Sequence, residues 1–222
     1  MTQSAPRRRS GTDWERVFIV PILTVLALAA GFKLFGDSST RAAHGFTMIL
    51  EVGYRVLLLA FYGLAIVLLL IRSEAKAKSP GLVPRLAAYT GTFLPFLLPF
   101  VAGSEPPPAL ATGAVVLQFL GMGFTVYALW VLGRSFGVAP QARTLVQTGP
   151  YRMIRHPLYT GEIVSLLGAV LFSPSLAKFG ILVAVALLQG QRAVFEERLL
   201  SAHLPGYAEY MTRTKRFIPH VF

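Results

Sequence analysis

The stretch Val56-Leu-Leu-Leu-Ala-Phe-Tyr-Gly-Leu-Ala-Ile-Val-Leu-Leu-Leu-Ile71 contains no charged residue and decides the fold class. It ends an apolar run that begins at about Gly45, and a helix of roughly 20 mostly apolar residues crosses the hydrocarbon core of a bilayer. The chain of 222 residues is 54% hydrophobic and only 14% charged, whereas soluble domains carry about 25% charged residues. A water-soluble fold of this size cannot hide so much apolar surface. We therefore predict an integral membrane protein.

Further apolar runs surround this stretch, and no long hydrophilic block remains for a separate soluble domain. Pro95 and Pro99 predict a kink in the third run. The last two runs are short for a full crossing, and the Ser-Pro-Ser link between them predicts a helical hairpin. The expected fold is all-α, a polytopic bundle of about five to six membrane helices. The runs are Val17–Phe35, Gly45–Ile71, Leu86–Val101, Ala109–Leu132, Pro157–Phe172 and Leu176–Gly190.

The basic residues predict the orientation of the bundle. Seventeen of the 21 lysines and arginines lie on alternate connections, which fall on one side of the membrane. The positive-inside rule makes this side cytoplasmic, with both termini in the cytoplasm. The apolar run after the basic N-terminus has no small-residue cleavage pattern, so we expect a retained first span in a bacterial plasma membrane. These seventeen are Arg7, Arg8, Arg9, Arg16, Arg72, Lys76, Lys78, Arg85, Arg134, Arg143, Arg152, Arg155, Arg192, Arg198, Arg213, Lys215 and Arg216.

Composition also excludes several kinds of chemistry. The chain has no cysteine, which rules out disulfides, thiolate nucleophiles and cysteine-ligated metals, and no metal site is expected. The net charge of +11 does not indicate nucleic acid, because the charges occupy short gaps between apolar runs. Glu51 and Arg55, one turn apart within the second run, are either a self-neutralising pair or a functional pair at membrane depth.

Polar chemistry concentrates in two segments. In Gly149-Pro-Tyr-Arg-Met-Ile-Arg-His-Pro-Leu-Tyr-Thr-Gly161, Pro157 is typical of the first residue of a helix with His156 at its cap. Such a helix start offers free N–H groups to an anionic ligand group. In Arg192-Ala-Val-Phe-Glu-Glu197, Arg192 and Glu196 lie one turn apart. Taken alone, the first segment also fits a helix cap that binds no ligand. The second also fits a group of charges that only anchors the helix end at the membrane interface.

The motifs together resemble the isoprenylcysteine carboxyl methyltransferase family, which is related to the phospholipid N-methyltransferases. The resemblance covers roughly residues 130–219. Besides the two segments above, it rests on Leu132-Gly-Arg-Ser-Phe136, Leu145-Val-Gln-Thr148, Tyr207-x-x-Tyr210 and Arg216-Phe-Ile-Pro219.

The resemblance implies a membrane methyltransferase that uses S-adenosyl-L-methionine and receives a lipophilic methyl acceptor from within the membrane. Residues 1–16 would form a basic cytoplasmic N-terminus, 17–132 a four-helix transmembrane region, and 133–222 the cofactor-binding and catalytic region with the helical hairpin and the C-terminal segment. Arg192 and Glu197 would be catalytic. The cofactor-binding residues would be Tyr151, His156, Pro157, Tyr159, Gly161 and Glu196.

Two versions of the reaction remain open at this stage. With a carboxylate acceptor, Arg192 would hold the acceptor and Glu197 would fix the guanidinium; with an amine acceptor, Glu197 would accept the proton. An NADPH-dependent sterol-type reductase is an alternative, with Arg143, Arg152 and Arg155 for the 2′-phosphate. A scaffold or transporter is a further alternative. The expected partners are the lipophilic acceptor and membrane lipids, not nucleic acid, and the oligomeric state is open.

Overall fold

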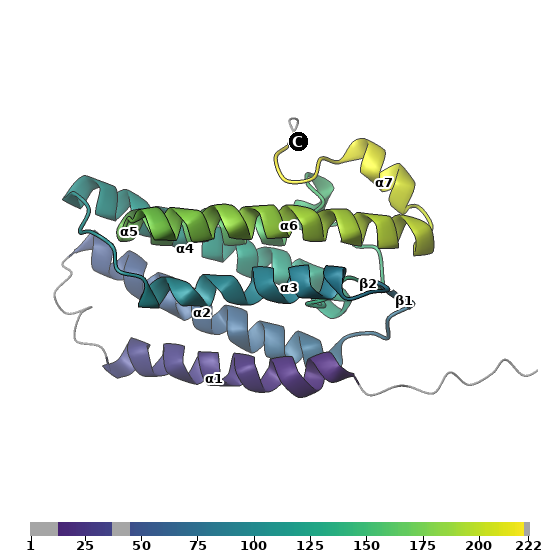
Figure 1. The fold of residues 1–222 in the computed structure, drawn as a ribbon, viewed down its shortest axis with the longest axis horizontal. Helices are drawn as coiled ribbons and strands as arrows, with labels where there is room; N and C mark the ends of the chain where they lie inside the picture. The colour runs from purple at the N-terminus through teal and green to yellow at the C-terminus, as the bar shows by residue number, and fades with distance from the viewer. Residues whose placement is uncertain (1–12, 37–44, 220–222) are drawn as a thin grey trace, which may run out of the picture.

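Helices dominate the computed structural model, which describes residues 13–36 and 45–219. The long helices lie side by side along one direction, while the short elements gather near one end of the bundle (Figure 1). This arrangement confirms the predicted all-α polytopic fold. The elements are α1 (Trp14–Gly36), α2 (Phe46–Ile71), β1 (Ala77–Lys78), α3 (Val83–Phe93), α4 (Pro108–Leu132), β2 (Gln141–Ala142), α5 (Pro157–Phe172), α6 (Leu176–His203) and α7 (Tyr207–Arg213), with 3₁₀ helices at Leu94–Phe100, Gly133–Ser135 and Gly149–Arg152.

Within residues 13–36 and 45–219, four helices are long and apolar enough to cross a membrane. They occupy Glu15–Leu34, Phe46–Ile71, Pro108–Ser135 and Leu176–His203. The third predicted run is α3, which continues as the 3₁₀ helix that contains Pro99. The change of helix type at Leu94 fits the kink expected from the prolines.

The prediction of a short last run is wrong. The apolar sequence ends near Gly190, but α6 continues to His203 and has 28 residues. Its polar continuation stays helical because Arg192 and Glu197 find partners in neighbouring segments, as described below. Among the helices that the structure describes for the predicted runs, α5, with 16 residues, and α3, with 11, are shorter than a full crossing.

Helix α5 packs most closely on α4 rather than on its hairpin partner. A Cβ at Gly121 would lie 2.3 Å from the backbone nitrogen of Ser165, and a Cβ at Gly161 would lie 2.4 Å from Oγ1 of Thr125. Small residues at these positions let the two backbones approach. The link to α6 is capped by Ser175, whose hydroxyl oxygen accepts from the N–H of Lys178 at 3.3 Å.

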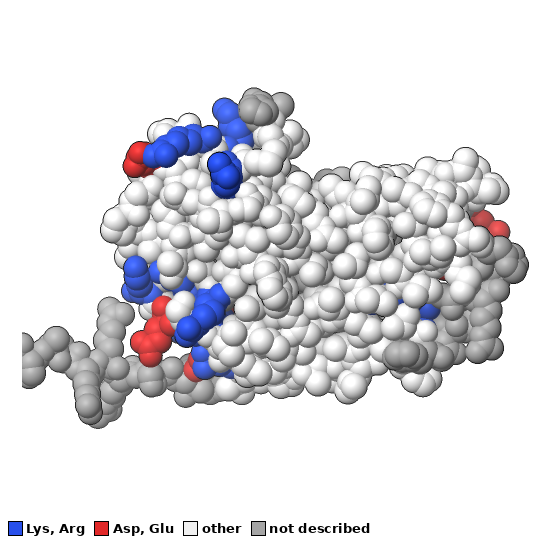
Figure 2. Space-filling view, turned by 180° about the vertical axis from the view of Figure 1, so that it is seen from behind, with Lys and Arg blue, Asp and Glu red and all other residues white. Residues whose placement is uncertain are grey.

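Exposed basic residues gather at one end of the molecule (Figure 2). Their positions agree with the sequence pattern, since the connections after α2 and α4 and the helix α7 lie at the same end (Figure 1). The Glu51–Arg55 pair lies elsewhere, and Arg55 donates a hydrogen bond to the carbonyl oxygen of Lys33 at 3.0 Å. Residues 7–9, three arginines of the predicted basic N-terminus, lie outside the described residues.

Candidate active site

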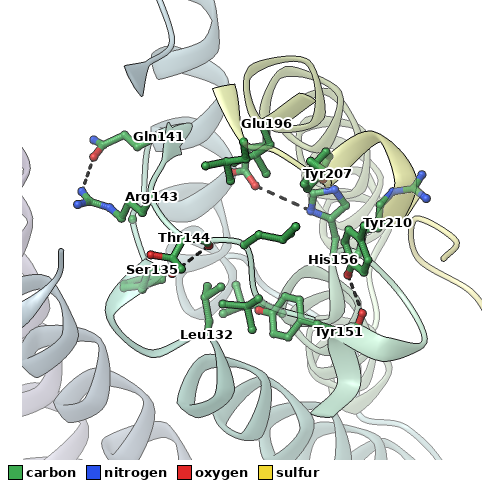
Figure 3. Close-up of a pocket in the computed structure, with 18 of the residues that line it drawn as sticks. Leu132, Ser135, Gln141, Arg143, Thr144, Tyr151, His156, Glu196, Tyr207 and Tyr210 are labelled. Carbon is green, nitrogen blue, oxygen red and sulfur yellow. Dashed lines mark hydrogen bonds and ion pairs between the residues drawn. The ribbon is translucent and has the colours of Figure 1, made fainter. Parts of the chain in front are cut away.

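A pocket opens at this end of the bundle, among segments that are far apart in the sequence. Its walls come from the end of α4, the loop that follows it, the starts of α5 and α7, and the last part of α6. Five predicted site residues line it together: Tyr151, His156, Tyr159, Arg192 and Glu196. Figure 3 shows Glu196, His156 and the tyrosines facing a wall that carries Gln141, Arg143 and Thr144.

His156 occupies the cap of α5, directly before Pro157, as the sequence predicts. Its ring stacks on Tyr159, with the ring centroids 5.3 Å apart and the planes 8° from parallel. It also lies between two carboxylates: Nε2 is 3.2 Å from Oε1 of Glu197, and Nδ1 is 3.9 Å from Oε2 of Glu196. The imidazole is therefore held in one orientation, and one edge faces the pocket.

Arg192 is buried at the centre of the site. Its Nε donates to Oε1 of Glu196 at 3.1 Å, and its guanidinium lies 4.7 Å from the centre of the Tyr159 ring. The Tyr159 hydroxyl donates to the same Glu196 oxygen at 2.5 Å. The two terminal nitrogens of Arg192 make only long contacts of 3.4 Å, to Oγ1 of Thr92 and to the carbonyl oxygen of Gly137. This leaves the end of the guanidinium available for a stronger acceptor.

Glu197 does not fix the guanidinium of Arg192, so that part of the sequence prediction is wrong. Oε1 of Glu197 accepts from Nε of Arg155 at 2.8 Å, and Oε2 accepts from Nη2 of Arg216 at 2.6 Å. Successive residues on a helix differ by about 100° in direction, so the residue at i+4 stays near Arg192 while the residue at i+5 points away. Glu196, not Glu197, is the partner of Arg192.

The contacts of Glu197 join the C-terminal segment to the start of α5. The N–H groups of Arg155 and His156 donate to the carbonyl oxygens of Lys215 and Arg216, at 2.8 and 3.1 Å. Arg155 also donates to the carbonyl oxygens of Met211 and Thr214. Glu197 is 3% exposed, so it forms a buried clamp beneath this segment.

Pro157 and Gly161 do not line the pocket. Pro157 is the buried first residue of α5, where its missing N–H has no cost. Gly161 faces Thr125 of α4. Both residues shape the helix that carries His156 and Tyr159, and the predicted contact with a cofactor is not seen in the pocket lining.

Several pocket residues were missed by the sequence prediction. Tyr207 and Tyr210, quoted above only as part of a motif, line the pocket from α7. Burial raises the pKa of the Tyr210 phenol to about 12, and its hydroxyl donates to the carbonyl oxygen of Tyr151 at 2.6 Å. Arg143 is 4% exposed, and burial together with the charge of Arg72 lowers its pKa to about 10.

A partly buried polar pair lies deeper in the bundle and was also missed. Nε2 of Gln189 in α6 donates to Oε2 of Glu162 in α5 at 2.6 Å. Glu162 follows Tyr159 by three residues on the same helix. A polar pair among apolar runs carries no periodic signal, so the sequence alone gave no reason to select it.

Sequence comparison finds similar proteins over part of the chain. Residues 108–205 match the family model described as phospholipid methyltransferase. The cobalt-zinc-cadmium resistance protein CzcN of Cupriavidus metallidurans is 34% identical over 116 residues, which are 52% of this chain and 51% of that protein. The nickel-cobalt-cadmium resistance protein NccN of Alcaligenes xylosoxydans xylosoxydans is 33% identical over 113 residues, half of either protein. The chain thus spans about half the length of these curated relatives.

A solved structure shares the fold along almost the whole chain. The eukaryotic intramembrane Ras methyltransferase ICMT (isoprenylcysteine carboxyl methyltransferase) superposes with a TM-score of 0.51 and 19% sequence identity, over 93% of this chain and 75% of that one. The fold and the site thus define a class, the polytopic membrane proteins with an ICMT-like fold and a pocket at one end that charged and apolar residues line together. Within this fold, residues 108–205 match the phospholipid methyltransferase family model, and these findings support a membrane methyltransferase.

Proposed function

We propose that the protein transfers a methyl group from S-adenosyl-L-methionine to a lipophilic acceptor that reaches the pocket from the bilayer, and that this end of the bundle faces the cytoplasm. The observation that carries the proposal is the convergence of His156, Tyr159, Arg192 and Glu196, which come from two helices and line one pocket. Each of the four contacts at least one of the others. Their geometry is therefore fixed before any ligand binds.

The residues of the pocket fit the methyl donor. The Glu196 carboxylate, partly exposed, suits a hydroxyl, an ammonium or the positive charge of a sulfonium. The start of α5 suits a carboxylate because it offers N–H groups and the partial positive charge of a helix N-terminus. Tyr151, Tyr207 and Leu158 supply aromatic and apolar surface for a flat ring. When bound, the donor supplies an electrophilic methyl group, and the task of the protein is alignment and exclusion of water.

A carboxylate acceptor fits Arg192 best. The terminal nitrogens of Arg192 make only weak contacts, and a planar guanidinium binds a carboxylate with two parallel hydrogen bonds. An ionised carboxylate is already a nucleophile, so no proton has to be removed. Glu196 keeps the guanidinium oriented through Nε and so replaces Glu197 in this role.

The match to the phospholipid methyltransferase family favours an amine as the second candidate acceptor. An amine must lose a proton when it is methylated, and Glu196 is the carboxylate that lines the pocket. In this version Arg192 would only orient Glu196. Glu197 is unsuited as the proton acceptor because Arg155, His156 and Arg216 already occupy its oxygens.

The other activities considered have less support in the site. A reductase that binds NADPH needs free basic side chains for the 2′-phosphate at the pocket. Arg155 is held by Glu197, Arg143 is buried beside Gln141, and Arg152 does not line the pocket. CzcN and NccN are named for resistance to metals. Among the described residues, no three His, Asp or Glu side chains are grouped so that they could hold a metal ion. We therefore propose methyl transfer rather than metal binding as the activity of this chain.

Titration of the purified full chain in lipid nanodiscs with S-adenosyl-L-methionine tests the proposal. We expect saturable binding by the wild type and weaker binding by His156→Ala. Arg192→Ala should keep its affinity for the donor while methyl transfer falls by about 100-fold or more, since acceptor alignment is lost. Arg198→Ala, at an exposed position of the same helix, is the matched control. An equal loss of donor affinity in the His156 and Arg192 variants would overturn the division of roles.

A further inference from the structure

One wall of the pocket is contacted, on its side away from the cavity, by residues of α1 and of the segment that follows α2. The loop that contains Gly137, Ala139, Gln141 and Arg143 lines the pocket. On its other side the loop pairs with the connection after α2, where the N–H of Lys76 donates to the carbonyl oxygen of Ala142 at 2.7 Å. The loop itself has little regular structure, so external contacts determine its shape.

Glu15, in the first turn of α1, makes the most direct of these contacts. Its Oε1 accepts from the backbone N–H of Ala139 at 2.8 Å and from Nε2 of Gln141 at 3.1 Å. Glu15 is only 5% exposed. A buried carboxylate that accepts a backbone N–H fixes that peptide strongly, because a hydrogen bond to a charged acceptor is about twice as strong as a neutral one.

The second oxygen of Glu15 has a separate partner. Oε2 pairs with Nη1 of Arg72, whose side chain is completely buried. Arg72 also pairs with Asp13 and so is held from two sides. The two oxygens of Glu15 therefore have different roles: Oε2 balances the buried charge of Arg72, and Oε1 binds the loop.

The contacts continue from Glu15 into the pocket. Oε1 of Gln141 accepts from Nη2 of Arg143, and both residues line the cavity (Figure 3). The path thus runs from α1 through two hydrogen bonds to a pocket guanidinium. None of the residues at its outer end, Asp13, Glu15 and Arg72, lies within the family match at 108–205.

We propose that Glu15 is a positioning residue that shapes the donor-binding wall of the pocket through Ala139 and Gln141, and that this role is separate from its pairing with Arg72. This inference rests on the proposed function in one respect, since it takes the ligand at this wall to be S-adenosyl-L-methionine. A role that merely neutralised Arg72 would not use Oε1. The two roles are therefore separable by substitution.

Two conservative variants separate them. Glu15→Asp keeps the negative charge but shortens the side chain by about 1.5 Å, so we expect Asp to stay paired with Arg72 and to lose Ala139. Donor affinity should then fall roughly 10- to 100-fold, as expected when pocket groups are misplaced by about 1 Å, while hydrogen exchange at the Ala139 amide accelerates. Arg72→Lys leaves the contacts of Glu15 with the loop in place but removes the planar guanidinium that pairs with both Asp13 and Glu15. The melting temperature should therefore fall while donor affinity stays unchanged.

The measurements use the full chain in nanodiscs, with Glu74→Gln, at an exposed position near Arg72, as the matched control. Wild-type affinity and wild-type exchange in a folded Glu15→Asp variant would refute the inference. A loss of donor affinity in Arg72→Lys as large as in Glu15→Asp would refute it as well. If the wild type does not bind the donor but Glu15→Asp still accelerates exchange at Ala139, the proposed function fails and the positioning role stands.

Discussion

The Glu197 clamp gives a prediction whose size follows from its contacts. Replacing Glu197 by Gln removes the charge that faces Arg155, His156 and Arg216. Breaking a buried ion pair by removing one partner costs about 3–5 kcal/mol. The cost is lower here because the Arg216 side chain is 26% exposed and Arg155 keeps two carbonyl acceptors. We expect a loss of about 2–3 kcal/mol in unfolding free energy, since Gln retains one hydrogen-bond acceptor.

Thermal melting of the nanodisc-embedded protein measures this loss. A change of about 1 kcal/mol shifts the melting temperature by roughly 2–4 °C in a chain of this size, so the variant should melt roughly 5–10 °C lower. Trypsin should also cleave after Lys215 sooner, because the C-terminal segment loses its anchor. Glu209→Gln is the matched control: it breaks an ion pair with Arg213 in which both side chains are about two-thirds exposed, which is worth about 0–1 kcal/mol. Equal shifts in the two variants would refute the clamp.

Two further predictions concern packing and acid stability. Gly161→Ala should lower the free energy of unfolding by about 1–3 kcal/mol, because the new methyl group overpacks α4 near Thr125. The control Gly180→Ala in α6, where a Cβ has nothing within 4 Å, should be neutral or stabilising in the same melting assay. The reverse order would contradict the close α4–α5 packing. Burial raises the pKa of Asp13, but the hydrogen bond and charge of Arg72 outweigh it and hold the pKa below the ordinary 3.8. A group with a lowered folded-state pKa stabilises the fold above its unfolded pKa and loses this contribution as pH falls through the folded pKa. In an acid titration, the stability of Asp13→Asn should therefore decline less than that of the wild type below pH ~3.8. Identical declines would contradict the pairing of Asp13 with Arg72.

The sequence predicted the features that depend on local patterns. Apolar run length predicted the membrane helices, and proline chemistry predicted that α5 begins at Pro157 with His156 as its cap. Arg192 and Glu196 share a helix face because they are four residues apart, so their contact follows from local spacing, although the prediction paired Arg192 with Glu197. Apolar run length failed for α6, because the helix continues beyond its apolar part through polar residues that have tertiary partners.

The features that the sequence could not predict depend on remote contacts. Glu197 was assigned to Arg192 by proximity along the chain, but its partners Arg155 and Arg216 come from segments 42 and 19 residues away. Gly161 was placed beside a ligand, but the neighbour that requires a glycine is the backbone of α4. The contact of Glu15 with Ala139 joins residues 124 positions apart, and no periodicity in either segment indicates it.

Transfer of label from methyl-labelled S-adenosyl-L-methionine to fractionated membrane lipids tests the central claim most directly. The full chain in nanodiscs should label a lipophilic fraction, and Arg192→Ala should not. Release of volatile labelled methanol by base would identify a methyl ester and hence a carboxylate acceptor; label that base does not release as methanol would exclude the ester and fit an amine. If the wild-type protein binds the donor but transfers no label to any lipophilic fraction, the proposed methyl transfer to a membrane acceptor is contradicted.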